Sequence, residues 1–197
     1  MQTSPTAAQV SVPGFADHHA HLLRDAAGVA FPATAQAVRD FHRRVAEQGL
    51  SPMDVLDPPA QVARPALDSR LAAALTGAAA VGLVEVTEMG MRSWAYLDAL
   101  TALQAAGPMP CRVRIYLASG LAGECSPAEL EARRAEGGPW VQLDGVKFYA
   151  DGWLGPRTCA MWRKFDDEDS DGILFQIATP NDADVSLGGV FSVDAVR

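Results

Sequence analysis

The residues best suited to chemistry lie in a short cluster near the N-terminus, Asp17-His18-His19-Ala20-His21. Three of the four histidines in the 197-residue chain fall in this cluster. If the segment is a strand, successive side chains point to opposite faces, so His19 and His21 share one face. Two imidazoles at that spacing can bind one divalent metal ion. The alternative is an incidental cluster at a strand end. We favour the metal site because histidines are so few elsewhere.

A second candidate group lies in the segment 145–155, GVKFYADGWLG. On a strand, Lys147, Tyr149 and Asp151 would share one face. A lysine that points into a protein core is unfavourable unless it is paired or neutralised. Carboxylation of its amine would turn Lys147 into an anionic metal ligand. The alternative is an ion pair with Asp151 or Glu88, and the residues alone favour that alternative.

Two acidic features complete the candidates. Glu88 is expected where a strand gives way to a loop, which is the end where α/β proteins place their sites. A helix-capping or ion-paired carboxylate is an equally good interpretation of Glu88. The stretch FDDEDSDG (165–172) matches the first half of a calcium-binding loop, but Ala178 stands where the twelfth-position glutamate belongs. A solvated acidic turn is therefore the better interpretation of that stretch.

Composition excludes several classes of protein. Hydrophobic residues make up 49% of the chain and charged residues 20%, which is a globular balance. The net charge of -8 argues against nucleic-acid binding. No apolar run approaches the roughly 20 residues that span a bilayer, and the first residues lack the features of a secretory signal. Three cysteines without a C-x-x-C pair favour a reducing compartment, so we expect a cytoplasmic protein without membrane partners.

The elements that must position these residues alternate between strand and helix. Strands are expected at 12–22, 83–89, 111–119 and 145–151, and helices at 66–80, about 93–106, and after a capping box formed by Ser126 and Glu129. A long segment, 23–65, contains a short helix that Thr34 could cap, and its length suggests a lid. Four βα units without hairpin signals predict an α/β fold with a parallel sheet. Such a sheet is either half of a (β/α)8 barrel or a small open sheet.

Three segments resemble the amidohydrolase superfamily of metal-dependent hydrolases. VPGFADHHAHL (12–22) resembles its first-strand pattern of apolar-Pro-Gly-Phe-x-Asp-x-His-x-His, and GLVEVTEMG (82–90) resembles its second-strand segment. GVKFYADGWLGPRTCAM (145–161) resembles the fourth-strand segment of the branch that includes N-substituted formamide deformylases. The segments occur in the family's order, and the likeness extends over roughly residues 10–175.

The resemblance implies a partial (β/α)8 barrel with a metal centre at the carboxyl ends of its strands. His19 and His21 match the first-strand ligands. Lys147 matches a fourth-strand lysine that related hydantoinase-like enzymes often carboxylate to bridge two metal ions. One or two divalent ions are implied, and zinc is the expected metal because imidazole ligands suit it. The implied activity is hydrolysis of a non-peptide, amide-like C–N bond in a small molecule.

The resemblance also implies roles for three further residues. Asp151 is the candidate catalytic residue of this chain, and Glu88 and Tyr149 are expected to line the pocket. In the family, however, the catalytic base is an aspartate after strand eight, and two more histidine ligands follow strands five and six. This sequence has no histidine after His42. We therefore expect an incomplete chain.

The expected organisation follows from that comparison. Residues 1–12 would be a remnant of a flanking segment, and 13–175 the N-terminal half of a barrel with a lid-like insertion at 23–65. Residues 176–197 would be a divergent tail, from an altered reading frame or a fusion. An open half-barrel exposes a strand edge and an apolar interior, so we expect a homo-oligomer or a marginally stable chain.

Two other functions stay open at this point. One is a non-catalytic metal-binding or assembly half-barrel, or an inactive truncated remnant. The other is a small open α/β domain whose chemistry centres on Asp151 and Glu88.

Overall fold

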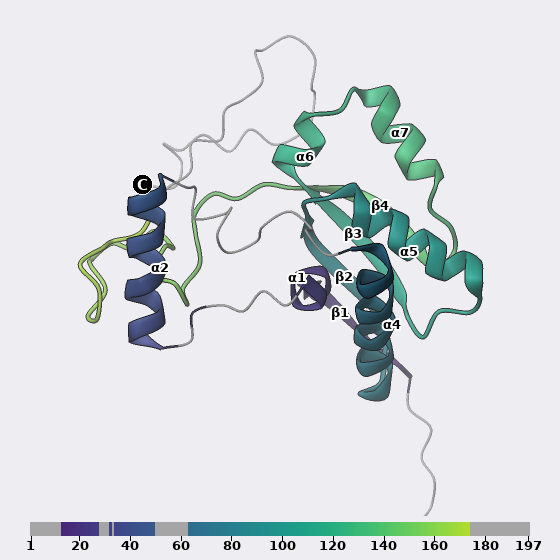
Figure 1. The fold of residues 1–197 in the computed structure, drawn as a ribbon, viewed down its shortest axis with the longest axis horizontal. Helices are drawn as coiled ribbons and strands as arrows, with labels where there is room; N and C mark the ends of the chain where they lie inside the picture. The colour runs from purple at the N-terminus through teal and green to yellow at the C-terminus, as the bar shows by residue number, and fades with distance from the viewer. Residues whose placement is uncertain (1–12, 28–31, 33, 50–62, 174–197) are drawn as a thin grey trace, which may run out of the picture.

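A parallel sheet forms the centre of the computed structural model, which describes residues 13–27, 32, 34–49 and 63–173. Its four strands lie in the order β1-β2-β3-β4: β1 (Phe15–Ala20), β2 (Leu83–Met91), β3 (Arg112–Ala118) and β4 (Val141–Lys147). All three neighbouring pairs are parallel. The helices are α1 (Leu22–Ala27), α2 (Ala35–Gln48), α4 (Arg64–Ala80), α5 (Trp94–Ala106), α6 (Ser119–Gly123) and α7 (Pro127–Ala135) (Figure 1). The predicted α/β class is confirmed, and the arrangement is that of a partial βα barrel.

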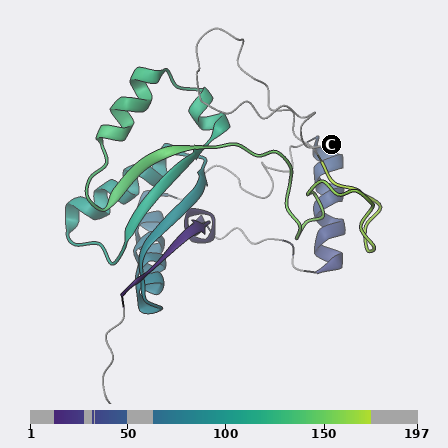
Figure 2. The same ribbon diagram turned by 180° about the vertical axis from the view of Figure 1, so that it is seen from behind.

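Helices α4 and α5 lie on one face of the sheet, and Figure 2 views the sheet from the opposite face. The hydrophobic core fills the space between these two helices and the sheet. In α4, Leu67, Leu71 and Leu75 recur every fourth position and are at most 1% exposed. Alternate residues of β3, such as Val113 and Ile115, are fully buried against the helices. The intervening side chains of β3 point to the other face, so the period-two pattern separates a helix-covered face from an open one.

Side-chain caps explain where three helices begin. The hydroxyl of Thr34 accepts a hydrogen bond from the backbone N–H of Ala37 at 3.1 Å, as expected for the start of α2. Ser93 caps α5 in the same way. Ser126 and Glu129 form both halves of the predicted capping box at the start of α7.

The fourth strand differs from its prediction. We expected it at 145–151, but β4 runs from Val141 to Lys147. The reason is core packing, because Val141 and Leu143 are 0% and 7% exposed and pair with buried residues of β3. Tyr149 and Asp151 therefore follow the strand, and the expectation that they share a strand face with Lys147 is wrong.

The segment 23–65 is described in part. It includes all of α1 except its first residue and the whole of α2, and α2 lies beside the chain that follows β4 (Figure 1). The ring nitrogen Nε2 of His42 donates a hydrogen bond to the carbonyl oxygen of Pro156 at 2.7 Å, which ties the two together. Residues 1–12 and 176–197 lie outside the described residues, and so do parts of 23–65.

The acidic stretch 165–172 forms a surface turn. Arg157 pairs with Asp167 at 2.6 Å, and Lys164 pairs with Asp169 at 2.5 Å. The hydrogen bond from each cation lowers the pKa of its carboxyl partner. No helix among the described residues has the length and apolar character needed to cross a bilayer.

Candidate metal centre

His19 and His21 lie together at the carboxyl end of β1. Their ring centroids are 5.3 Å apart, and the rings meet edge to face at 76°. The pairing of β1 with β2 is irregular between Asp17 and Ala20, where the carboxylate of Asp17 accepts a hydrogen bond from the backbone N–H of His19. The strand ends at Ala20. The two imidazoles are therefore near neighbours at the end of the strand where α/β folds place their sites.

Glu88 belongs to β2 and contacts the residues that follow β1. Its side chain is buried, and its Oε2 accepts a hydrogen bond from the backbone N–H of Leu23 at 2.9 Å. Its Oε1 lies 3.9 Å from Nδ1 of His21. Glu88 therefore has both features of the alternative interpretation, a helix cap and a paired carboxyl group. It caps the start of α1, and it faces the imidazole of His21.

Lys147 and Tyr149 reach toward β2 from the other edge of the sheet. The Lys147 ammonium lies 5.2 Å from the centroid of the Tyr149 ring, which is a cation–π distance. Gly90 of β2 has a φ of +112°, and a Cβ placed there would lie 2.3 Å from Oη of Tyr149 and 3.9 Å from Cγ of Lys147. The missing side chain of Gly90 thus makes room for both residues at the carboxyl end of β2.

Asp151 forms a hydrogen bond within the loop that follows β4. Its Oδ2 accepts a hydrogen bond from the backbone N–H of Ala160 at 3.0 Å. Burial, and then the charge of Asp151, raise the pKa of the Cys159 thiol. The structure therefore places Asp151 beyond the end of β4, with one carboxylate oxygen used by the loop itself.

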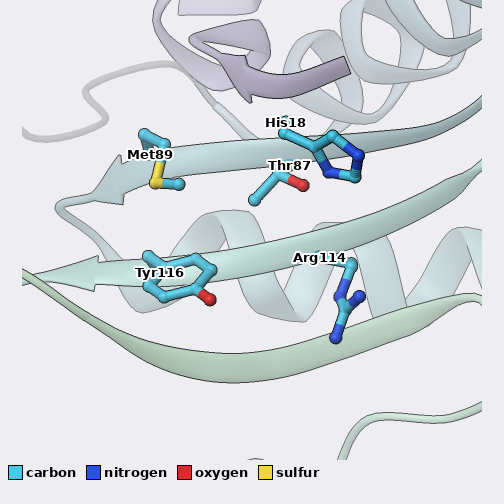
Figure 3. Close-up of a pocket in the computed structure, with 5 residues that line it drawn as sticks. All are labelled: His18, Thr87, Met89, Arg114 and Tyr116. Atoms are coloured by element: carbon cyan, nitrogen blue, oxygen red, sulfur yellow. The ribbon is translucent and has the colours of Figure 1, made fainter. Parts of the chain in front are cut away.

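A hollow on the open face contains a histidine that sequence reasoning missed. Figure 3 shows its five lining side chains, which come from β1, β2 and β3 and surround a space of about 150 Å³: His18, Thr87, Met89, Arg114 and Tyr116. His19 and His21 were singled out by their spacing, whereas His18 lines this hollow. The signal for it was present in β3, where polar Arg114 and Tyr116 alternate with buried aliphatic residues.

Two acidic residues lie beside Arg114, one of the side chains that line this hollow. The guanidinium of Arg114 is hydrogen-bonded to Asp144 of β4, and it lies 3.8 Å from a carboxylate oxygen of Glu85 of β2. The hydrogen bond to Asp144, followed by the charge of that carboxylate, raises the pKa of Arg114. The open face is therefore polar across three strands, with its charges paired.

The donor set can be compared with the needs of a metal ion. Among the described residues, no three His, Cys, Asp or Glu side chains form a group that could hold a metal ion. A catalytic zinc site usually has three protein ligands and one open position. His19 and His21 fit two of those ligands. Lys147 is the further candidate from the sequence, and it lies at the carboxyl end of β4.

Comparisons with known proteins bear on the fold. The chain matches no protein-family model and no curated protein. A crystal structure of an uncharacterized metal-dependent hydrolase from Pyrococcus horikoshii OT3 aligns with it at a TM-score of 0.51 and 16% identity. The two chains share a fold. The match covers 82% of this chain and 48% of the other, so this chain spans about half the length of that hydrolase. An uncharacterized metal-dependent hydrolase from Pyrococcus furiosus aligns at a TM-score of 0.45 and 19% identity, covering 77% of this chain and 31% of the other.

Proposed function

We propose that the chain forms part of a metal-dependent hydrolase of the amidohydrolase type, which cleaves an amide-like C–N bond in a small molecule. The observation that carries the proposal is the contact of two imidazoles at the carboxyl end of β1, with Lys147 at the carboxyl end of β4. Parallel strands have their carboxyl ends at the same end of the sheet, although β1 and β4 are its two outer strands. The three segments that resemble the superfamily contain the same residues, and the description of the structure from Pyrococcus horikoshii OT3 supports the same class.

In this proposal His19, His21 and a carboxylated Lys147 hold one or two divalent ions, and zinc is the expected ion. A metal ion bound there would lower the pKa of a water molecule and polarise the scissile carbonyl. Tyr149 packs beside Lys147 and is proposed to line the substrate pocket. Asp151 is proposed to take a proton from the attacking water and pass it to the leaving amine, with its carboxylate oriented by the backbone N–H of Ala160.

A second candidate function is a non-catalytic metal-binding half-barrel. It is favoured by one observation, namely that the described residues contain two adjacent imidazoles but no group of three His, Cys, Asp or Glu side chains around a metal site. Metal binding with hydrolysis supports the enzyme, whereas metal binding without turnover supports the half-barrel.

The test is a zinc titration of the purified chain against a chromophoric chelator. We expect the double variant His19→Ala/His21→Ala to lose zinc binding, because both ligands come from one strand end. His42→Ala is the matched control, since its histidine contacts Pro156 instead. Equal zinc affinity in the wild type and the double variant would refute the site.

Lys147 needs a test of its own. Carbon-13 NMR of protein kept in labelled bicarbonate should show a carbamate signal that Lys147→Ala lacks. A zinc-bound wild type without such a signal would refute the carboxylated lysine. Turnover would be measured on a panel of N-substituted formamides and related amides, and its loss in the double histidine variant would link hydrolysis to the metal.

A further inference from the structure

Glu88 is an ionisable side chain in the interior of the protein. It is 2% exposed and belongs to β2, where it is in register with Ala20 of β1. A buried carboxylate is unfavourable unless polar partners compensate for its lost hydration. An apolar residue would fill this space without that penalty, so the partners of Glu88 should explain why a carboxylate stands there.

Two partners of Glu88 lie at the end of β1. One oxygen accepts a hydrogen bond from the backbone N–H of Leu23 at 2.9 Å, and the other lies 3.9 Å from Nδ1 of His21. The first contact fixes the backbone just after His21. The second places a carboxyl oxygen beside one nitrogen of its ring. Ala20, which precedes His21, is paired with Glu88 in the sheet. The position of His21 is therefore fixed on both sides, by β1 before it and by α1 after it.

The two nitrogens of an imidazole then have different surroundings. At 3.9 Å the Nδ1–Oε1 contact is an electrostatic contact and is longer than a hydrogen bond. A carboxylate on that side still favours the tautomer with the proton on Nδ1, which leaves the lone pair on Nε2. Metal-binding histidines commonly direct their second nitrogen to a carboxylate in this way.

We propose that Glu88 is the positioning residue for His21, selecting the tautomer and ring orientation that offer Nε2 to a metal ion. The proposal rests on the proposed function only in the role of His21 as a metal ligand. In this proposal Glu88 acts through His21, so it is a positioning residue and not a catalytic one. A purely structural role would be to cap the N–H of Leu23, and the test must separate the two roles.

Glu88→Gln is the suitable variant, because glutamine keeps the size and an oxygen that can accept the hydrogen bond from Leu23. The measurement is long-range ¹H–¹⁵N NMR of metal-free, histidine-labelled protein at a pH where the imidazoles are neutral. We expect His21 of the wild type to carry its proton on Nδ1, and Glu88→Gln to shift a substantial fraction to Nε2. Asp144→Asn is the matched control, since it removes a carboxylate from β4 and should leave His21 unchanged.

Zinc affinity gives the second readout. Loss of such a carboxylate partner typically weakens metal binding by about 10 to 100-fold, and we expect Glu88→Gln to fall in that range while Asp144→Asn stays near the wild type. An Nε2-protonated His21 in the wild type would overturn the proposal without any variant, so it remains testable if Glu88→Gln fails to fold. An unchanged tautomer in Glu88→Gln would also overturn it and leave Glu88 as a helix cap. A tautomer shift in a protein that binds no zinc would support the positioning role and refute the metal site.

Discussion

Replacement of Gly90 by alanine tests how β2, Lys147 and Tyr149 meet at the carboxyl edge of the sheet. The backbone of Gly90 has a φ of +112°, which residues with a Cβ rarely adopt. We expect this strain to cost about 1 to 3 kcal/mol. The new methyl group would also lie 2.3 Å from Oη of Tyr149. Moving that side chain adds about 1 to 3 kcal/mol, as overpacking does elsewhere. The total is about 2 to 6 kcal/mol of lost stability.

Urea unfolding followed by circular dichroism would measure the change. Gly90→Ala should lower the midpoint without changing the slope, which depends on the surface exposed by unfolding. Gly77→Ala is the matched control. Gly77 lies in α4 with no atom within 4 Å of the position of a Cβ. Alanine favours a helix over glycine by up to about 1 kcal/mol, so the same substitution should stabilise the protein there.

A double-mutant cycle then isolates the contact with Tyr149. Tyr149→Phe removes the oxygen, and the nearest remaining ring atom lies 3.4 Å from the position of the new Cβ. Gly90→Ala/Tyr149→Phe should therefore be less destabilised than the sum of the single variants, while the backbone strain remains. Additive costs would show that Tyr149 does not pack against Gly90. An unchanged midpoint in Gly90→Ala would refute the positive φ as well.

Three other outcomes can be measured on the same protein. Leu71→Ala should lower the free energy of unfolding by about 2 to 5 kcal/mol in urea titrations, because its side chain is 0% exposed in the core. Burial raises the pKa of the Cys111 thiol, so Cys111 should react with a thiol reagent only on unfolding, as mass spectrometry of the labelled peptides would show. Hydrogen bonds from Ser126 lower the pKa of Glu129 from 4.5. The stability from this pair is therefore full above pH 4.5 and is lost as the pH falls through the folded pKa. Ser126→Ala should weaken that acid dependence in urea midpoints measured against pH, and an identical slope in both proteins would contradict it.

Local signals in the sequence predicted most of the described fold. Thr34 and the pair Ser126 and Glu129 mark helix starts because their side chains satisfy backbone N–H groups that the helix itself cannot. The leucine stripe of α4 follows from helical periodicity. These features depend on residues a few positions apart, so one sequence is sufficient to recognise them.

The parts that were missed depend on contacts between distant segments. Val141 and Leu143 determine where β4 begins, because they fit beside residues of β3 that the sequence alone does not pair with them. Strict alternation along β1 was assumed, whereas its pairing with β2 shifts between Asp17 and Ala20. The position of His18 over the hollow was therefore not predicted. The grouping of His19 with His21 agrees with their 5.3 Å separation, although metal binding by them stays a prediction.

The second strand connects the two halves of the proposed centre, although none of its own residues is a proposed ligand. Glu88 contacts the end of β1 that holds His21, and Gly90 makes room for Lys147 and Tyr149 from β4. Glu88 and Gly90 are two residues apart in β2. A small change in the backbone of β2 would therefore move both His21 and the pair of Lys147 and Tyr149. Because β2 lies between β1 and β3, it is hydrogen-bonded to a neighbouring strand on both sides. A metal site assembled from edge strands needs such a fixed element, since ligand geometry must be held to within a fraction of an ångström.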